Sequence, residues 1–400
     1  MSNRHDIRLD LQCLLDIAQQ ETGLADFDDD DLPNRAGMAV EAYRRLDLPA
    51  LTQEKAAESI LDIMVTRLRM TQDRKDYPGI AEETIAKPIV VAGFPRSGTT
   101  LLYSLLAADP QARSPHWWDA LHPTPPVGLS PEHDVLRKQI AHREVAEFLR
   151  VNPIKPAHNF FYLGADMILE CYMLWGLDFR ALSPFLYFRV PAHPSLDPGG
   201  SSLNLGADMV AAYAFEKRLL QTLQWRRPTG HWVLKDPTNQ FYLPEMQQVF
   251  PDATFVWPHR DPVQMFASVV ELTCLMTGGV AGVEIDRKVM AKALLDLFAA
   301  GLDRVLDHPI VDSPAVVHVA YRDMTGDMQG FAAKLYDRIG RDFTPQVAAN
   351  IDAYRNDPRN RADLYGKFQY SLENTGLSAD QVREAFGPYI EKFDVPVDNG

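Results

Sequence analysis

The chain has 400 residues, of which 46% are hydrophobic, and this is enough to bury one large core or two smaller ones. Its formal net charge of −14 disfavours nucleic acid and anionic membrane surfaces as partners, because both are negatively charged. No run of about 18 apolar residues is present to span a bilayer, and the polar N-terminus is not expected to be a signal peptide. The three cysteines lack metal-ligand spacing. These features predict a folded cytoplasmic protein with reduced thiols.

The first 86 residues are predicted to be helical. Apolar residues recur with a period of 3.6 in residues 11–20, 35–48 and 51–70. The acidic stretch 26–33 lacks the Gly and the terminal Glu of a calcium-binding loop, so we expect a solvated turn there. Residues 1–86 therefore form an N-terminal helical segment in this prediction.

A strand, a glycine-bounded loop and a helix are predicted at residues 89–110. Ile89 to Ala92 is an apolar, β-branched run typical of a buried parallel strand. Gly93 and Gly98 bound a tight loop, and leucines then recur at helical spacing. In this arrangement backbone N–H groups and the positive end of the helix point at one place, which suits an anion. A chance match to the glycine spacing is the alternative, and the flanking strand and helix argue against it.

This loop departs from the loop of nucleotide triphosphatases. Those loops carry a Lys directly after the second Gly, and the next hydroxyl residue helps to hold Mg²⁺. Here Thr99 and Thr100 follow Gly98, and the cation, Arg96, lies inside the loop. We therefore expect an anion bound by Arg96, hydroxyls and backbone amides, without a metal ion.

A second candidate phosphate site lies in residues 253–272. An apolar strand there ends at Arg260, and Asp261 with Pro262 predicts the start of a helix that carries Ser268. An arginine at the end of a strand offers a two-pronged donor to a phosphate group. A surface turn with a salt bridge is the alternative interpretation of this segment taken alone.

Together the two segments resemble the nucleotide site of sulfotransferases that use 3′-phosphoadenosine-5′-phosphosulfate (PAPS). The resemblance is to a bacterial branch related to the protein-tyrosine sulfotransferases, and it runs from about residue 30 to the C-terminus. In that family the first loop binds the 5′-phosphosulfate, and an Arg and a Ser spaced like Arg260 and Ser268 bind the 3′-phosphate. The resemblance implies that PAPS is the co-substrate and that its binding residues are Arg96, Ser97, Gly98, Thr99, Thr100, Arg260, Ser268 and Tyr321.

Two further residues fall in the order that the family shows. The strand predicted at 232–235 ends at Lys235, where the family places a Lys that reaches the transferring sulfuryl group. Tyr321 follows another strand and matches a Tyr that lies against adenine in related cytosolic enzymes. PAPS carries roughly four negative charges, so an acidic chain needs cations in one cleft. Arg96, Lys235 and Arg260 all follow strand ends, where open α/β sheets place their ligands.

The fold class expected from this pattern is α/β, with a P-loop-type parallel sheet flanked by helices over residues 87–400. Its strands are predicted at 88–92, 232–235, 253–257 and 315–320. The long interval between the first two is too long for a loop. We expect a helical cap insertion at about 111–231. Its aromatic residues, Trp175 among them, are either core of the cap or the lining of a pocket for an apolar acceptor.

Transfer to a hydroxyl needs a base for the acceptor proton and positive charge at the leaving phosphate. Lys235 and Arg96 meet the second need. Relatives often place their base in a Trp-Glu pair after the first loop, where this chain has Trp118 and Asp119. We therefore rank the candidate bases by this position: Asp119 first, then His116, then Glu170. His158, which matches a His of the cap in relatives, is a further candidate.

Two other positions depart from the family. Asn239 and Phe368 stand where relatives often carry His, and neither can accept the proton. The leading prediction is a sulfotransferase that moves the sulfuryl group of PAPS to a hydroxyl of a small, apolar or aromatic acceptor. The alternatives are a P-loop kinase of a metabolite and a nucleotide-binding relative that has lost catalysis. The sequence indicates neither the acceptor nor the oligomeric state.

Overall fold

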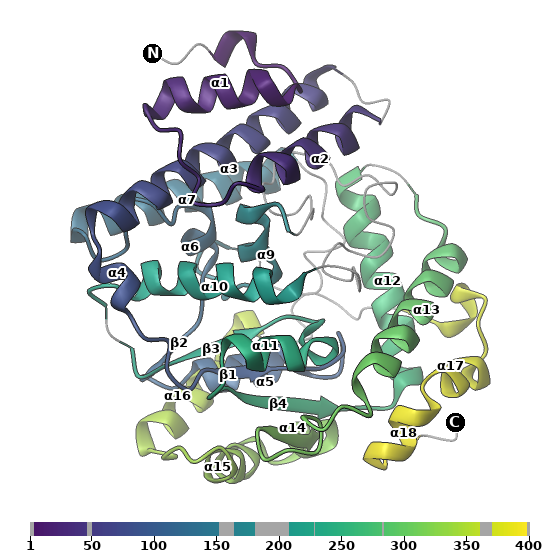
Figure 1. The fold of residues 1–400 in the computed structure, drawn as a ribbon. Helices are drawn as coiled ribbons and strands as arrows, with labels where there is room; N and C mark the ends of the chain where they lie inside the picture. The colour runs from purple at the N-terminus through teal and green to yellow at the C-terminus, as the bar shows by residue number, and fades with distance from the viewer. Residues whose placement is uncertain are drawn as a thin grey trace.

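A five-stranded parallel sheet lies at the centre of the structure, in the strand order β2-β3-β1-β4-β5 (Figure 1). The structure is a computed structural model, and it describes residues 4–45, 50–151, 164–180, 208–227, 229–281, 284–360 and 370–397. The strands are β1 Ile89–Val91, β2 Ala112–Arg113, β3 His231–Lys235, β4 Thr254–His259 and β5 Val316–Ala320. The predicted α/β class and its four strands are confirmed. The short edge strand β2 was not anticipated from the sequence.

Alternate residues of each strand point to opposite faces of the sheet, and both faces are covered by helices. In β1, Ile89 and Val91 pack on one face and Val90 on the other. The first face is covered by α5 Thr99–Ala107, α14 Tyr321–Gly326, α15 Met328–Arg338 and α16 Pro345–Asn356. The second is covered by α10 Met209–Gln224, α11 Leu243–Val249, α12 Pro262–Ala281, α13 Arg287–Val305, α17 Ala379–Ala385 and α18 Gly387–Phe393.

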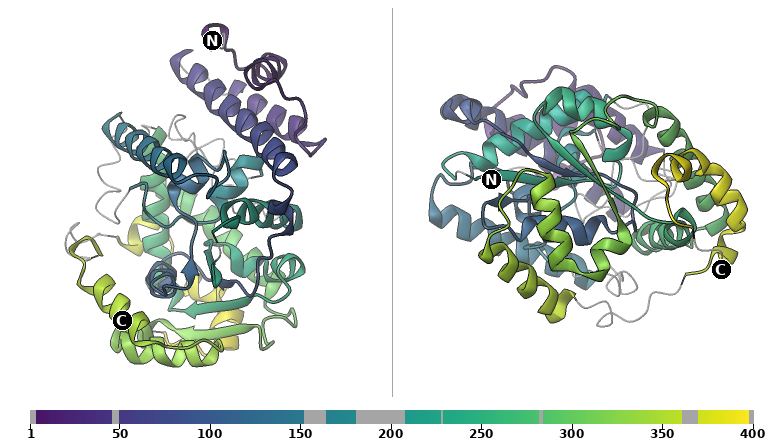
Figure 2. Two further views of the ribbon diagram at one scale, coloured as in Figure 1. Left: turned by 90° about the vertical axis from the view of Figure 1, so that its left-hand side faces the viewer. Right: turned by 90° about the horizontal axis from the view of Figure 1, so that it is seen from below.

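Three N-terminal helices form a separate layer above the sheet (Figure 1) and project from the rest of the molecule in the left view of Figure 2. They are α1 Leu11–Thr22, α2 Leu32–Arg44 and α3 Ala50–Asp76, which confirms the predicted helices. Their buried side chains make a hydrophobic cluster of their own. The boundary between residues 86 and 87 stays a prediction.

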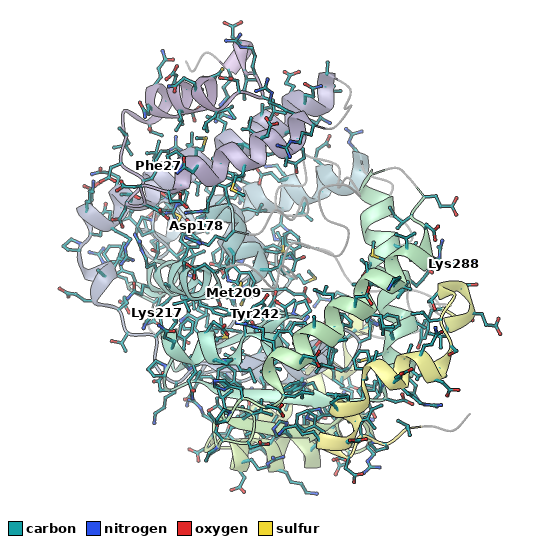
Figure 3. All side chains as sticks on the ribbon, turned by 45° about the vertical axis from the view of Figure 1, so that its right-hand side comes forward. Phe27, Asp178, Met209, Lys217, Tyr242 and Lys288 are labelled. Atoms are coloured by element: carbon teal, nitrogen blue, oxygen red, sulfur yellow. The ribbon has the colours of Figure 1, made fainter. Side chains whose placement is uncertain are left out.

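A buried ionic network joins these helices to the cap. The Asp178 side chain is only 2% exposed and lies beneath the N-terminal helices (Figure 3). Its two carboxylate oxygens lie 3.1 Å from Arg67 Nη1 and 3.1 Å from Arg35 Nη2. Arg35 Nε also donates to the Asp178 carbonyl oxygen at 2.9 Å, and Phe179 packs into the N-terminal cluster. The turn that ends at Phe179 is therefore held by charge and by apolar contact.

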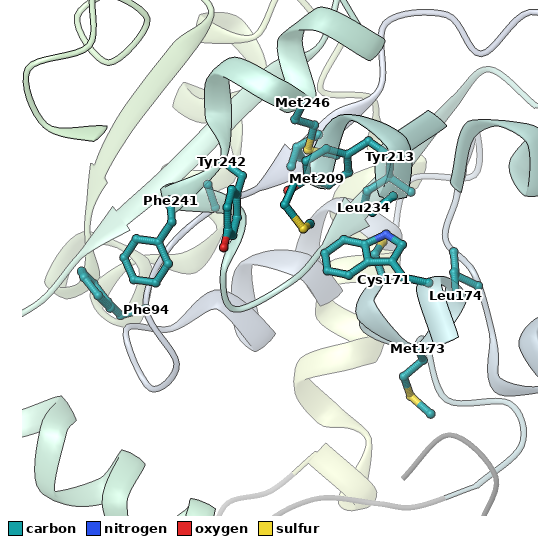
Figure 4. Packing of buried hydrophobic residues seen from close by; sticks show 14 of the residues in the cluster. Phe94, Cys171, Met173, Leu174, Met209, Tyr213, Leu234, Phe241, Tyr242 and Met246 are labelled. Atoms are coloured by element: carbon teal, nitrogen blue, oxygen red, sulfur yellow. The ribbon is translucent and has the colours of Figure 1, made fainter. Parts of the chain in front are cut away.

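The described part of the cap contains short and long helices around one core. They are α6 Trp117–Leu121, α7 Pro131–Val151, α9 Tyr172–Trp175 and α10. Trp175 is buried and its ring meets Tyr213 edge-on, with centroids 5.4 Å apart. Cys171, Leu174 and Leu234 belong to the same hydrophobic cluster and are labelled with Tyr213 in Figure 4. Trp175 is therefore core, whereas most aromatic residues of the predicted pocket lie outside the described residues.

None of the described helices combines the length and the apolar character needed to cross a membrane.

Replacing Asp178 by Asn should lower the free energy of unfolding by about 3–5 kcal/mol, because the buried guanidinium group of Arg67 would lose its counter-charge, whereas Arg35 also pairs with Asp29. Asp31→Asn is the matched control, since Asp31 pairs with the same Arg35 but its side chain is 63% exposed. We expect the control to leave stability nearly unchanged. Urea unfolding followed by circular dichroism measures both variants. Equal stability of the two would contradict the role given to Asp178.

Candidate functional site

The loop between β1 and α5 makes a tight turn that depends on Gly98. This residue precedes the first turn of α5 and has a φ of 95°, which glycine adopts without strain. A Cβ atom there would lie 2.6 Å from Met324 Cε and 2.8 Å from Tyr321 Cδ2. Arg96 also has a positive φ, of 68°. Strained backbone of this kind persists where the surrounding structure holds it, and it often marks a functional site.

The loop presents the N-terminus of α5 to a ligand. The first N–H groups of any helix lack partners within the helix, and none of the described side chains caps this one. Ser97 is buried and its hydroxyl donates to the Phe94 carbonyl oxygen at 2.7 Å, so it stabilises the turn. Thr99 is buried, and Thr100 is exposed. The geometry suits an anion at the start of α5.

The two predicted phosphate segments meet in the structure. Arg260 Nη1 donates to the Arg96 carbonyl oxygen at 2.8 Å. Arg96 Nε donates to Ser268 Oγ at 3.0 Å. Burial is the main cause that lowers the pKa of Arg96, and the nearby charge of Arg260 acts in the same direction. Two guanidinium groups that are brought this close are stabilised by an anion between them.

Tyr321 lies beside both segments. The guanidinium carbon of Arg260 lies 4.2 Å from the centroid of the Tyr321 ring. Arg260 Nε is buried and has no hydrogen-bond partner among the described residues. A buried donor of this kind is costly unless a ligand accepts from it. The contact of Tyr321 with adenine, which the resemblance implies, stays a prediction.

Lys235 lies at the end of β3, beside the start of the loop. The register of the sheet pairs its Cα with that of Val91 in β1. Its side chain is 4% exposed, and Nζ forms an ion pair with Glu170 Oε1. The Glu170 side chain is 37% exposed, so this carboxylate is open to solvent on one side. A carboxylate from the cap and an ammonium group from the sheet therefore meet at the carboxyl edge of the sheet.

Gln240 has a role that the sequence did not reveal. Its Oε1 accepts the N–H of Gly93 at 3.0 Å, and its Nε2 donates to the Pro237 carbonyl oxygen at 2.8 Å. Gln240 thus joins the turn after Lys235 to the first loop. No local pattern could have indicated this, because the first contact spans 147 residues.

Asn239 is fully buried rather than open to an acceptor. Its Oδ1 accepts the hydroxyl of Tyr213 at 3.1 Å, which joins the turn after β3 to α10. Phe368 and His158 lie outside the described residues.

Asp119 and His116 lie at the start of α6. The side chain of Asp119 is 0% exposed, and its Oδ2 accepts the N–H of His116 at 2.9 Å. Oδ1 lies 3.5 Å from Arg113 Nη2. The carboxylate thus stabilises the start of the helix and pairs with an arginine. His116 is 33% exposed and stacks on Trp118. Their assignment as base stays a prediction.

The start of α6 lies next to the segment that leads to Glu170. The N–H of Trp117 donates to the Met167 carbonyl oxygen at 3.2 Å, and the N–H of Leu169 donates to the Pro115 carbonyl oxygen at 2.9 Å. All three ranked candidates therefore lie in one region. Of the three, Glu170 is the one in contact with Lys235.

Comparisons with known proteins show the family of the chain. The sequence pattern of the sulfotransferase family matches residues 88–345. The chain is 27% identical over 332 residues to the omega-hydroxy-beta-dihydromenaquinone-9 sulfotransferase Stf3 of Mycobacterium bovis, covering 78% of this chain and 77% of Stf3.

Two crystal structures share the fold. Sulfotransferase STF9 from Mycobacterium avium superposes with a TM-score of 0.78 at 24% identity, over 99% of each chain. Sulfotransferase STF1 from Mycobacterium tuberculosis H37Rv gives a TM-score of 0.72 at 25% identity, over 94% of this chain and 98% of that one. The family pattern covers more than half of the chain and includes both predicted phosphate segments and Lys235. The chain belongs to the sulfotransferase family, and it is a transferase that takes the sulfuryl group from PAPS.

Proposed function

We propose that Glu170 is the base of this sulfotransferase and that the acceptor is a small apolar or aromatic molecule with a hydroxyl. The ion pair between Glu170 and Lys235 carries the proposal. The base must reach the acceptor hydroxyl, and a cation must reach the leaving phosphate. Only the sulfuryl group separates the acceptor oxygen from the phosphate oxygen, so the base and the cation must lie close together. A partly exposed carboxylate beside the family's lysine meets that requirement. Fully buried Asp119 would first have to give up its contacts with the start of α6.

The residues present fit PAPS as the donor. The start of α5 and Arg96 suit the 5′-phosphosulfate. The buried Nε of Arg260, which has no hydrogen-bond partner in the part of the chain that the structure describes, suits the 3′-phosphate. Gly98 keeps the loop free of a side chain where Tyr321 and Met324 approach. Bound PAPS supplies the sulfuryl group and a phosphate leaving group. Lys235 and Arg96 neutralise the charge that develops on that phosphate.

Glu170 takes the acceptor proton in this mechanism. The acceptor oxygen forms the new bond to sulfur, the bond from sulfur to the bridging phosphate oxygen breaks, and the hydroxyl proton passes to the Glu170 carboxylate. A P-loop kinase is not favoured, because the family pattern is that of sulfotransferases and the residue directly after Gly98 is Thr99, not Lys.

The acceptor class rests on the cap and on one relative. Stf3 is named for an omega-hydroxy-beta-dihydromenaquinone-9, and we extend to this chain an apolar acceptor with a hydroxyl. Near Glu170 the cap contributes buried apolar side chains, including Leu169 and Met173. Turnover of labelled PAPS with hydroxylated quinones, phenols, sterols and sugars identifies the acceptor. The cytoplasmic location expected from the cysteines and the absence of nucleic-acid partners expected from the charge stay predictions.

Arg260→Ala should weaken binding of adenosine 3′,5′-bisphosphate about 10- to 100-fold while hardly changing binding of adenosine 5′-monophosphate, because a charge-assisted hydrogen bond contributes roughly 1.5–3 kcal/mol. Isothermal titration calorimetry measures both ligands. Arg322→Ala is the control, since Arg322 is an exposed arginine directly after Tyr321. Equal losses for both nucleotides would show that Arg260 does not bind the 3′-phosphate.

Activity should persist in excess chelator, since the loop offers Arg96, hydroxyls and amides in place of the lysine and metal of a kinase. Initial rates with and without EDTA test this. Adenosine 3′,5′-bisphosphate should also raise the melting temperature more than ATP with Mg²⁺ does, because a ligand that binds the native state stabilises it. A strict requirement for Mg²⁺ would contradict the metal-free mechanism.

Glu170→Gln should lower kcat about 10²- to 10⁴-fold, the usual contribution of a general base, and leave nucleotide affinity unchanged. Glu170→Asp keeps a carboxylate and should retain part of the activity. Asp119→Asn is the matched comparison. We expect it to lower the melting temperature, because Arg113 loses its buried counter-charge, and to reduce kcat less than Glu170→Gln does. Full kcat in Glu170→Gln together with loss in Asp119→Asn would transfer the role to Asp119.

A further inference from the structure

Three consecutive residues of the cap dock on two consecutive residues of the sheet edge. Glu170 pairs with the Lys235 ammonium. The N–H of Cys171 donates to the Lys235 carbonyl oxygen at 2.8 Å. The N–H of Tyr172 donates to Asp236 Oδ2 at 3.2 Å. The position of Glu170 is therefore set by two backbone contacts as well as by its own side chain.

Asp236 is built into this junction. It is fully buried, and its Oδ1 accepts both the N–H of Thr238, at 2.8 Å, and the hydroxyl of Thr238. The two oxygens of one carboxylate thus hold the turn after β3 and the first turn of α9. Because Asp236 is fully buried, it is not placed to touch an acceptor.

We infer that Asp236 is a positioning residue, which holds Glu170 against Lys235 by accepting the N–H of Tyr172 while Thr238 orients its carboxylate. This inference rests on the proposed role of Glu170 as base. Neither the ion pair nor the family resemblance requires a positioning role for Asp236, because Lys235 and Glu170 could meet through their flexible side chains alone. The backbone contact removes that freedom, and a base held in one place loses less entropy at transfer.

The charges around Asp236 make its hydrogen bonds necessary. Burial raises the pKa of Asp236 to about 7, and the carboxylate of Glu170 acts in the same direction, whereas Thr238 and Lys235 oppose the shift. Glu216, on α10, is also buried, and burial raises its pKa to about 7, with Asp236 acting in the same direction. The carboxyl groups of Glu170 and Asp236 thus lie near one lysine, and the donors on Asp236 favour its ionised form.

Asp236→Asn tests the positioning role, because it changes the hydrogen bonds of this side chain with little change in its volume. An amide offers one acceptor oxygen, so a side chain that keeps its bond to Thr238 turns its NH₂ toward the N–H of Tyr172. We expect kcat to fall about tenfold with the KM for PAPS and the affinity for adenosine 3′,5′-bisphosphate unchanged. In the Glu170→Gln background the same change should lower kcat less than about twofold, since effects that act through one group are not additive.

Hydrogen exchange gives a readout that does not depend on the identity of the base. The amides of Cys171 and Tyr172 should exchange about tenfold faster in Asp236→Asn, measured by mass spectrometry on a peptide spanning residues 169–175. Asp109→Asn is the matched control, because Asp109 is a buried aspartate that accepts a backbone N–H, from Gln111 at 2.8 Å. It should change neither kcat nor this exchange rate. Thr238→Val, which removes the hydroxyl donor, should shift both readouts in the same direction as Asp236→Asn, and it serves if Asp236→Asn does not fold.

The outcomes are distinguishable. Unchanged exchange at residues 171 and 172 overturns the positioning role, whatever the base is. Equal fold-losses from Asp236→Asn in the native and Glu170→Gln backgrounds also overturn it, while Glu170 remains the base. If Glu170→Gln keeps full kcat, the base assignment fails, and the exchange result alone decides whether Asp236 holds this segment.

Discussion

The constraint on which the rest of the structure depends is the parallel alignment of β3, β1 and β4, whose carboxyl ends meet at one edge of the sheet. Lys235 ends β3, Arg96 follows β1, and Arg260 follows β4, so the alignment brings three cations together in a chain of net charge −14. Each of these cations has a local partner: Glu170 for Lys235, Ser268 for Arg96, and the Tyr321 ring for Arg260. The proposed nucleotide site of this acidic protein therefore gathers cationic donors that can form charge-assisted hydrogen bonds to phosphate groups.

Much of this arrangement could be predicted from the sequence, because its signals are local. The loop from Gly93 to Gly98, the strand before it and the helix after it occupy one short stretch, and the same holds for Arg260 and its helix. The sheet order then brought the two together without further information. The edge strand β2 was missed, since it has two residues and carries no periodic pattern. Gln240 was missed because its contact with Gly93 exists only when β1 and β3 are paired.

The candidate bases illustrate where local reasoning stops. Asp119 was ranked first by its place in the sequence, and that place is the third residue of a short helix, where a carboxylate accepts the N–H of the residue before the helix. The position of Asp119 after Trp118 matches the motif of relatives, and the same position lets its carboxylate accept the N–H of His116. Glu170 carried a weaker signal in the sequence, yet the fold brings it to Lys235 across 65 residues. Long-range contacts of this kind depend on how the cap docks, which no local pattern encodes.

The sheet and the cap contribute different groups to the proposed site. The sheet edge supplies the loop, the lysine and the arginines, whereas the cap supplies the proposed base and the apolar surroundings of the acceptor. Asp236 lies at the junction, one residue after Lys235, and its carboxylate accepts a backbone N–H from the cap. Because this contact uses a backbone donor, it holds the segment whichever side chains the cap carries. Side chains of the cap can then differ to suit another acceptor while the distance from base to lysine is kept, provided that the residue after the lysine still accepts that N–H.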